Sequence, residues 1–159
     1  MIGGAALILM GVIDRATQDV DCLEPDLPEP VRQAAEAFAS SYRGAGSPLR
    51  KDWLNEGPKA LRNDLPSGWQ DRVMPLLERP GLSLHTLGRL ELLATKLFAY
   101  CDRQQDEDDC LALKPTFDEL NRCLGWLSER DGHPQWPKHV RLSFHALAER
   151  LGYAYDPQP

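Results

Sequence analysis

The chain has 159 residues with a formal net charge of −6, from 24 acidic and 18 basic side chains. This length is most simply one domain with its own core, and the acidic charge would repel a polyanion, so any nucleic-acid contact must be local. One local group of basic residues stands out: Arg43, Arg50, Lys51, Lys59 and Arg62. Acidic residues lie between them, so we interpret the group as an ordinary mixed-charge surface.

Cysteine and histidine usage argues against a disulfide scaffold and a zinc site. The four cysteines form no Cys-x-x-Cys pair, and the four histidines are scattered without an i, i+4 pair. We therefore expect buried or half-buried thiols in a reducing, cytoplasmic setting.

The apolar run from Ala5 to Ile13 predicts a buried helix. It is too short to span the roughly 30 Å hydrocarbon layer of a membrane, and no basic segment precedes it as in a signal peptide. A glycine pair, Gly3 and Gly4, stands before it with only Met1 and Ile2 ahead. Since a glycine turn of this kind usually ends a strand, the first strand is a stub here or begins upstream.

Two carboxylates follow in the segment Asp19-Val20-Asp21. On an extended strand, residues i and i+2 point to the same face, so both carboxylates can coordinate the same divalent cations. A glycine turn upstream can admit a phosphate close to backbone N–H groups. The combination suggests nucleotidyl transfer, whereas an Asp-x-Asp alone is more often a solvated turn.

The sequence of the middle of the chain predicts helices, a long loop and a short strand. A helix is expected from Pro28 to about Tyr42, closed near Gly44. Residues 44–68 read as an ordered loop around Trp53-Leu54-Asn55, with a short strand or turn of helix, and are a candidate substrate-side element. A helix from Ser67 to about Leu77 and a short strand from Leu82 to Leu87 follow.

The C-terminal part predicts four helices. The first runs from Arg89 to about Arg103, with Lys96 on a stripe flanking its apolar face, so that its amine can reach out of the core. The others span Asp106 to Leu113, Thr116 to about Arg130, and about Pro137 to Leu151. Thr116 and Glu119 fit a capping box, and Gly152 ends the last helix.

The order of these motifs resembles the AbiEii-like nucleotidyltransferases of the DNA polymerase beta-like superfamily. The matching segments are Gly3 to Leu7, Arg15 to Asp21, Leu92 to Leu97 with Ala99, Arg103, and Asp106 to Asp109. The likeness covers about residues 2–113 and is closest to a bacterial branch with a Trp-Leu-Asn segment like that at 53–55. It implies an α+β fold, a small mixed sheet with helices around it: a core over 1–113 whose first strand is truncated, and a helical extension over 114–159 packed on the same domain.

The resemblance also implies roles for individual residues. Gly3 and Gly4 would form the turn against the nucleotide phosphates, Asp19 and Asp21 would hold Mg²⁺, and Arg15 and Thr17 would steady the carboxylates or a phosphate. Lys96 would contact phosphate, which suits a mobile point charge, and Asp109 would match the last acidic motif. The catalytic set is then Asp19, Asp21, Lys96 and Asp109. Superfamily enzymes commonly add a third carboxylate from a later strand; Leu82–Leu87 has none, and Glu91 on the next helix is nearby.

Three functions follow from different classes. The first is a Mg²⁺-dependent nucleotidyltransferase that moves a nucleotide from an NTP to an RNA end such as tRNA or to a protein hydroxyl, toxin-like beside an antitoxin protein or in phage defence. The second is a degenerate member that binds nucleotide or a partner without turnover. The third is a structural or interaction protein whose helical tail binds. We expect the first, with no membrane contact.

Overall fold

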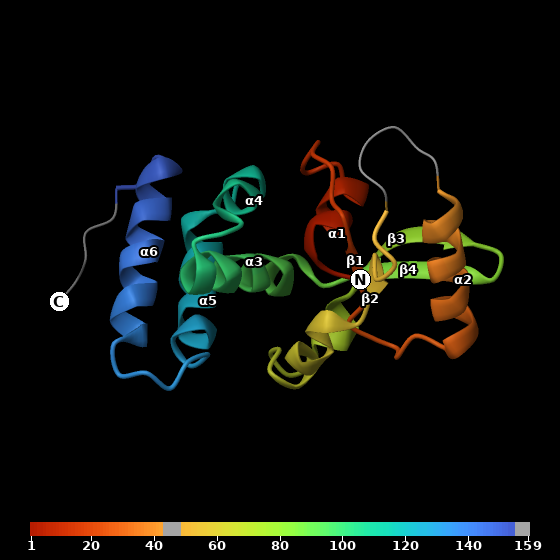
Figure 1. The fold of residues 1–159 in the computed structure, drawn as a ribbon. Helices are drawn as coiled ribbons and strands as arrows, with labels where there is room; N and C mark the ends of the chain where they lie inside the picture. The colour runs from red at the N-terminus through yellow and green to blue at the C-terminus, as the bar shows by residue number, and fades with distance from the viewer. Residues whose placement is uncertain (43–48, 155–159) are drawn as a thin grey trace. The chain divides into compact units, whose positions relative to one another are not determined.

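The computed structural model describes residues 1–42 and 49–154 and has an α+β fold (Figure 1). The chain divides into two compact units, Met1–Leu87 and Gly88–Pro159, and each is described here by itself. The α+β prediction is confirmed, and within residues 1–42 and 49–154 the strands form two sheets of two strands each. The proposed boundary between residues 113 and 114 stays a prediction.

The first sheet of unit one is built from two very short parallel strands. β1 (Val20–Asp21) pairs with β2 (Leu54–Asn55), in the register Val20 to Leu54 and Asp21 to Asn55. α1 (Gly3–Leu9) packs against β1 and buries Ala5, Ala6 and Leu7. The predicted helix over Ala5–Ile13 therefore exists, but it is shorter and takes the glycine pair into its first turn.

A longer helix and a 3-10 helix flank this sheet. α2 (Glu29–Ser41) has Pro30 in its first turn, as predicted; the expected end near Gly44, like Arg43, lies outside the described residues. The indole N–H of Trp53 donates to the Ala35 carbonyl at 3.0 Å, which ties the approach to β2 onto α2. After β2 the chain forms η1 (Gly57–Asn63), so this loop, where a short strand or a turn of helix was expected, contains both.

The second sheet is a hairpin where a helix was expected. η2 (Trp69–Arg72) is only one turn, and β3 (Met74–Arg79) then pairs antiparallel with β4 (Leu82–Thr86). The predicted helix from Ser67 to Leu77 is wrong, because Pro75 cannot donate inside a helix and clashes with the preceding turn. Arg79 pairs with Leu82 across a two-residue Pro80-Gly81 turn, and Gly81 has a φ of +79°. That dipeptide between apolar runs was the hairpin signal.

Met1 and Ile2 touch both sheets. The Ile2 N–H donates to the Asp21 carbonyl at 2.9 Å in an isolated antiparallel bridge, and the Met1 amine donates to the His85 carbonyl at 2.6 Å. These two residues therefore lie between an edge of β1 and an edge of β4.

Unit two is a helical assembly around α3 (Arg89–Arg103). α4 (Glu107–Ala112), α5 (Phe117–Ser128) and α6 (Trp136–Arg150) all pack against α3. The predicted capping box is confirmed: the Glu119 N–H donates to the Thr116 hydroxyl, and the Thr116 N–H donates to the Glu119 carboxylate. Glu119 also receives the Arg89 guanidinium at 2.6 Å, so the start of α5 is fastened to the start of α3.

The thiols behave as expected. Cys101, Cys110 and Cys123 are buried, Cys22 is half-buried, and all four are free. Burial raises the pKa of Cys101 to about 11 and that of Cys123 to about 12, so both are protonated at neutral pH. Across residues 1–42 and 49–154, no helix is long and apolar enough to cross a membrane.

Candidate functional site

Gly3, the first residue of the glycine pair, lies directly beside the Asp21 carboxylate. Gly3 has a φ of +77°, and a Cβ built on it would lie 2.9 Å from Oδ2 of Asp21. A side chain there would need both a strained backbone and a displaced carboxylate. The sequence therefore needs glycine at this position so that the chain can pass directly beside Asp21.

Gly4 lies close to Thr17 and Arg15, and Thr17 connects it to Asp19. A Cβ on Gly4 would lie 3.3 Å from the Thr17 hydroxyl and 3.9 Å from Nη2 of Arg15. The Thr17 hydroxyl in turn lies 3.2 Å from Oδ1 of Asp19, to which it donates. The six residues predicted from the N-terminal motifs thus form one cluster in unit one: Gly3, Gly4, Arg15, Thr17, Asp19 and Asp21.

Backbone pairing fixes the carboxylate segment. The Val20 N–H donates to the Trp53 carbonyl at 2.5 Å, and the Cys22 N–H donates to the Asn55 carbonyl at 2.8 Å. On the other side, the Asp21 carbonyl accepts from Ile2 at 2.9 Å. Asp21 is therefore anchored from both sides. The Asn55 side-chain oxygen accepts a hydrogen bond from the Gly57 N–H at 2.7 Å. In this structure the Asn55 side chain therefore stabilises the start of the loop that follows β2.

The donor set of this cluster fits magnesium. Mg²⁺ is usually held by one or two carboxylates, with substrate phosphates and water completing an octahedron. Asp19 and Asp21 supply the carboxylates, and Gly3 leaves space for close approach. Among the described residues there is no group of three or more His, Cys, Asp and Glu that could hold a metal ion.

The other two predicted catalytic residues form a buried ion pair in unit two. Nζ of Lys96 lies 2.7 Å from Oδ2 of Asp109 and 3.3 Å from Oδ2 of Asp106. The Lys96 side chain is 7% exposed and that of Asp109 is 1% exposed. Asp106 precedes α4, and Asp109 lies in its first turn, where the helix dipole favours acids. Asp106 belongs to this constellation, although sequence reasoning placed it only in the acidic run.

The exposed position expected for the Lys96 amine is wrong. α3 is buried on more than its apolar stripe: Leu92, Glu91 and Tyr100 are also buried, so the flanking positions lie inside the unit. The ammonium can sit there because Asp109 and Asp106 neutralise it. An acidic helix start is commonly solvated, but Asp109 is buried.

The third carboxylate of the superfamily has no counterpart on the expected strand. β4 carries the sequence Leu-Ser-Leu-His-Thr, without an acid. Glu91, the nearest acid in sequence, is 4% exposed in the first turn of α3, which belongs to unit two.

The close contact at Gly3 can be tested with a matched glycine. We expect Gly3→Ala to lower the free energy of unfolding by about 2 kcal/mol or more, because it adds a steric conflict with Asp21 to a left-handed backbone. Gly11 has a φ of +69°, and a Cβ added there would meet nothing within 4 Å, so Gly11→Ala should cost only the backbone strain, about 1 kcal/mol. Urea denaturation measures both; equal losses would show that the Asp21 contact is unimportant.

Comparison with known proteins identifies a family for this chain. A family model described as "Nucleotidyltransferase of unknown function (DUF6036)" matches residues 1–114, which include every residue of both clusters. No curated protein and no solved structure matches the chain. The match supports a nucleotidyltransferase family without singling out the AbiEii-like branch. The chain belongs to the DUF6036 family of nucleotidyltransferases of unknown function.

Proposed function

We propose that this protein is a Mg²⁺-dependent nucleotidyltransferase whose nucleotide site is the cluster around Gly3, Gly4, Asp19 and Asp21. The observation that supports it most is the close approach of Gly3 to the Asp21 carboxylate, where a Cβ would lie only 2.9 Å from Oδ2. A bare backbone beside a metal-binding acid is what a triphosphate needs, since its oxygens must reach the metal and backbone N–H groups together.

Each residue of the cluster has its own proposed role. Asp19 and Asp21 would hold the metal, and Thr17, whose hydroxyl donates to Oδ1 of Asp19, would keep that carboxylate oriented. Arg15 lies near Gly4, where a guanidinium suits phosphate oxygens. When bound, Mg²⁺ would neutralise charge on the α-phosphate and align the attacking hydroxyl opposite pyrophosphate.

The proposed catalytic residues also include Lys96 and Asp109, which form the ion pair described above within unit two. An ammonium has three N–H donors, and the contacts to Asp109 and Asp106 account for two of them. Lys96 would use the third for a phosphate oxygen, while Asp109 holds the amine in place. The acceptor would be an RNA end such as tRNA or a protein hydroxyl, and a toxin-like role would imply an antitoxin protein as partner.

A catalytically degenerate nucleotide binder is the second candidate. It is favoured by one observation, the absence of an acid on β4 within the described residues. Such a protein would keep the metal and phosphate contacts but would lack a base or a further metal ligand for the attacking hydroxyl.

The position of a radioactive label separates these functions. The purified protein is incubated with Mg²⁺ and each NTP, labelled in turn on the α- or γ-phosphate, together with total tRNA or a protein extract. Nucleotidyl transfer labels the acceptor from α-labelled NTP only, because the γ-phosphate leaves with pyrophosphate. We expect that pattern, with loss in EDTA.

The other outcomes are equally clear. A Mg²⁺-NTP thermal shift without label transfer would identify the degenerate binder. Transfer of the γ-label would indicate phosphoryl transfer instead. Neither shift nor transfer would leave the interaction protein as the remaining function.

A further inference from the structure

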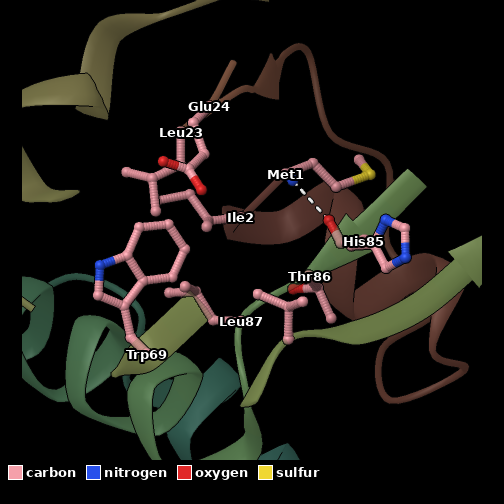
Figure 2. A pocket seen from close by; sticks show the side chains of 9 residues that line it. Met1, Ile2, Leu23, Glu24, Trp69, His85, Thr86 and Leu87 are labelled. Atoms are coloured by element: carbon pink, nitrogen blue, oxygen red, sulfur yellow. Dashed lines mark hydrogen bonds between the residues drawn. The ribbon is translucent and has the colours of Figure 1, made fainter. Parts of the chain in front are cut away.

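The pocket of unit one shown in Figure 2 is too small for a nucleotide. Its volume is about 110 Å³, whereas pockets that bind small molecules usually have about 300–1,000 Å³. Leu23, Trp69 and Leu87 give it apolar walls, and the Glu24 carboxylate in its lining would repel a phosphate. An exposed surface of unit one therefore suits the bases of a nucleic acid better than this pocket does.

Three aromatic side chains lie in contact at the surface of unit one: Phe38 on α2, Tyr42 directly after it, and Trp53 directly before β2. The ring centroid of Phe38 lies 5.6 Å from that of Tyr42 and 5.9 Å from that of Trp53. Phe38 is 50% exposed and Tyr42 is 40% exposed. Contiguous exposed apolar area of this kind marks an interaction site, and we call these three residues the aromatic surface.

The Trp53 ring is held in place from inside the unit. Its indole N–H donates to the Ala35 carbonyl at 3.0 Å, and the ring is half-buried. What this ring offers a ligand is therefore its π face and not its N–H. Nucleic-acid bases stack on such faces whatever their sequence, which is how proteins hold unpaired strands.

Two exposed cations, Arg50 and Lys51, stand directly beside the aromatic surface. The Trp53 N–H donates to the Arg50 carbonyl at 3.2 Å, which closes a turn over these residues. Asp52 accepts from two of the five guanidinium N–H donors of Arg50, at 2.9 and 2.6 Å. The pKa of Arg50 is raised, first by these hydrogen bonds and also by the negative charge of Asp19. Arg50 therefore lies near the proposed metal site and keeps donors for a phosphate.

The backbone also joins the aromatic surface to the candidate site. The Trp53 carbonyl accepts from the Val20 N–H at 2.5 Å, and Val20 stands between Asp19 and Asp21. One main-chain hydrogen bond therefore separates the residue that carries the indole from the segment that carries both carboxylates.

We propose that the aromatic surface binds the unpaired end of an RNA acceptor, with its bases stacked on the rings and its phosphates beside Arg50 and Lys51. The proposal rests on the proposed nucleotidyl transfer and chooses between its two acceptors, because a protein hydroxyl has no bases to stack. Charge favours a polyanion over a protein partner here, since the chain as a whole is acidic while these cations adjoin the rings.

The test measures binding of a fluorescein-labelled single-stranded RNA of about 12 nucleotides by fluorescence anisotropy, in EDTA and without NTP. Phe38→Leu keeps an apolar side chain and removes the ring. Val31→Ala is the control, because Val31 is 41% exposed on the same side of α2, two turns earlier. We expect Phe38→Leu to raise Kd about fivefold or more and Val31→Ala to change it less than about twofold. The same RNA as a duplex should not compete, because its bases are already stacked.

Acceptor kinetics separate this inference from the proposed function. With the RNA as acceptor and α-labelled NTP, Phe38→Leu should raise the KM for RNA about fivefold or more, while the KM for NTP stays within about twofold. Labelled RNA with both the Kd and the KM for RNA unchanged in Phe38→Leu would overturn this inference alone. RNA binding that depends on Phe38, without any label transfer by the wild type, would overturn the proposed function alone.

Three further results would contradict the inference. Loss of the Mg²⁺-NTP thermal shift in Phe38→Leu, with RNA binding kept, would assign the rings to the base of the NTP. Equal weakening of RNA binding by Val31→Ala would show that general apolar contact, and not stacking, is responsible. A dimer that Phe38→Leu converts to a monomer by light scattering, with RNA binding unchanged, would assign the aromatic surface to a second copy of the chain.

Discussion

Lys96→Met is expected to lower the free energy of unfolding by about 3–5 kcal/mol. The substitution leaves the Asp109 carboxylate, 1% exposed, without the ammonium 2.7 Å away, and an uncompensated buried charge is among the most costly single defects. Urea denaturation followed by circular dichroism measures the loss. The comparison holds if the m-value, the slope of the free energy of unfolding against urea concentration, stays that of the wild type.

Two further variants make this result specific. Lys138→Met changes an exposed lysine on α6 and should stay within about 0.5 kcal/mol of wild type. The double variant Lys96→Met with Asp109→Leu removes both charges and should recover most of the stability, because well-packed apolar residues often replace a buried pair at little cost. A Lys96→Met loss no larger than that of Lys138→Met would contradict the buried pair.

Asp21→Asn is expected to reduce transfer of the α-label by at least about 100-fold with little change in stability. The amide keeps the shape of the side chain beside Gly3 but is a much poorer magnesium ligand, and the metal contributes several kcal/mol to the transition state. Initial rates of acceptor labelling at saturating Mg²⁺ measure the change.

The control for this experiment comes from the same segment. Asp14 is an exposed acid seven residues before Asp21, and Asp14→Asn removes the same charge outside the cluster. It should retain the wild-type rate. Equal losses in both variants would mean that net charge, and not a metal ligand, governs the rate.

The local signals in the sequence were sufficient for much of this architecture. Arg89–Arg103 carried a clear apolar period, and Thr116 with Glu119 carried a capping box; both are present as predicted. The grouping of Gly3 and Gly4 with Thr17, Asp19 and Asp21 followed from motif order, and the structure brings these residues together. Their roles in catalysis stay predictions.

The two errors had different causes. Met74–Arg79 is a strand that pairs with Leu82–Thr86, and the helix prediction overlooked two local signals for this hairpin, Pro75 and the Pro80-Gly81 turn. Lys96 was placed by its angle on the helix, but its environment is set by α4, which brings Asp109 against it. A buried lysine could have been suspected only from the acidic run that follows it.

A crystal of the protein with Mn²⁺ and a non-hydrolysable NTP analogue tests the central claim most directly. Mn²⁺ replaces Mg²⁺ at oxygen ligands and can be located by its anomalous scattering. The account predicts an anomalous peak bound by the carboxylates of Asp19 and Asp21, with the triphosphate against Gly3 and Gly4. A manganese ion or a triphosphate bound elsewhere, with this cluster unchanged from its present contacts, would contradict it.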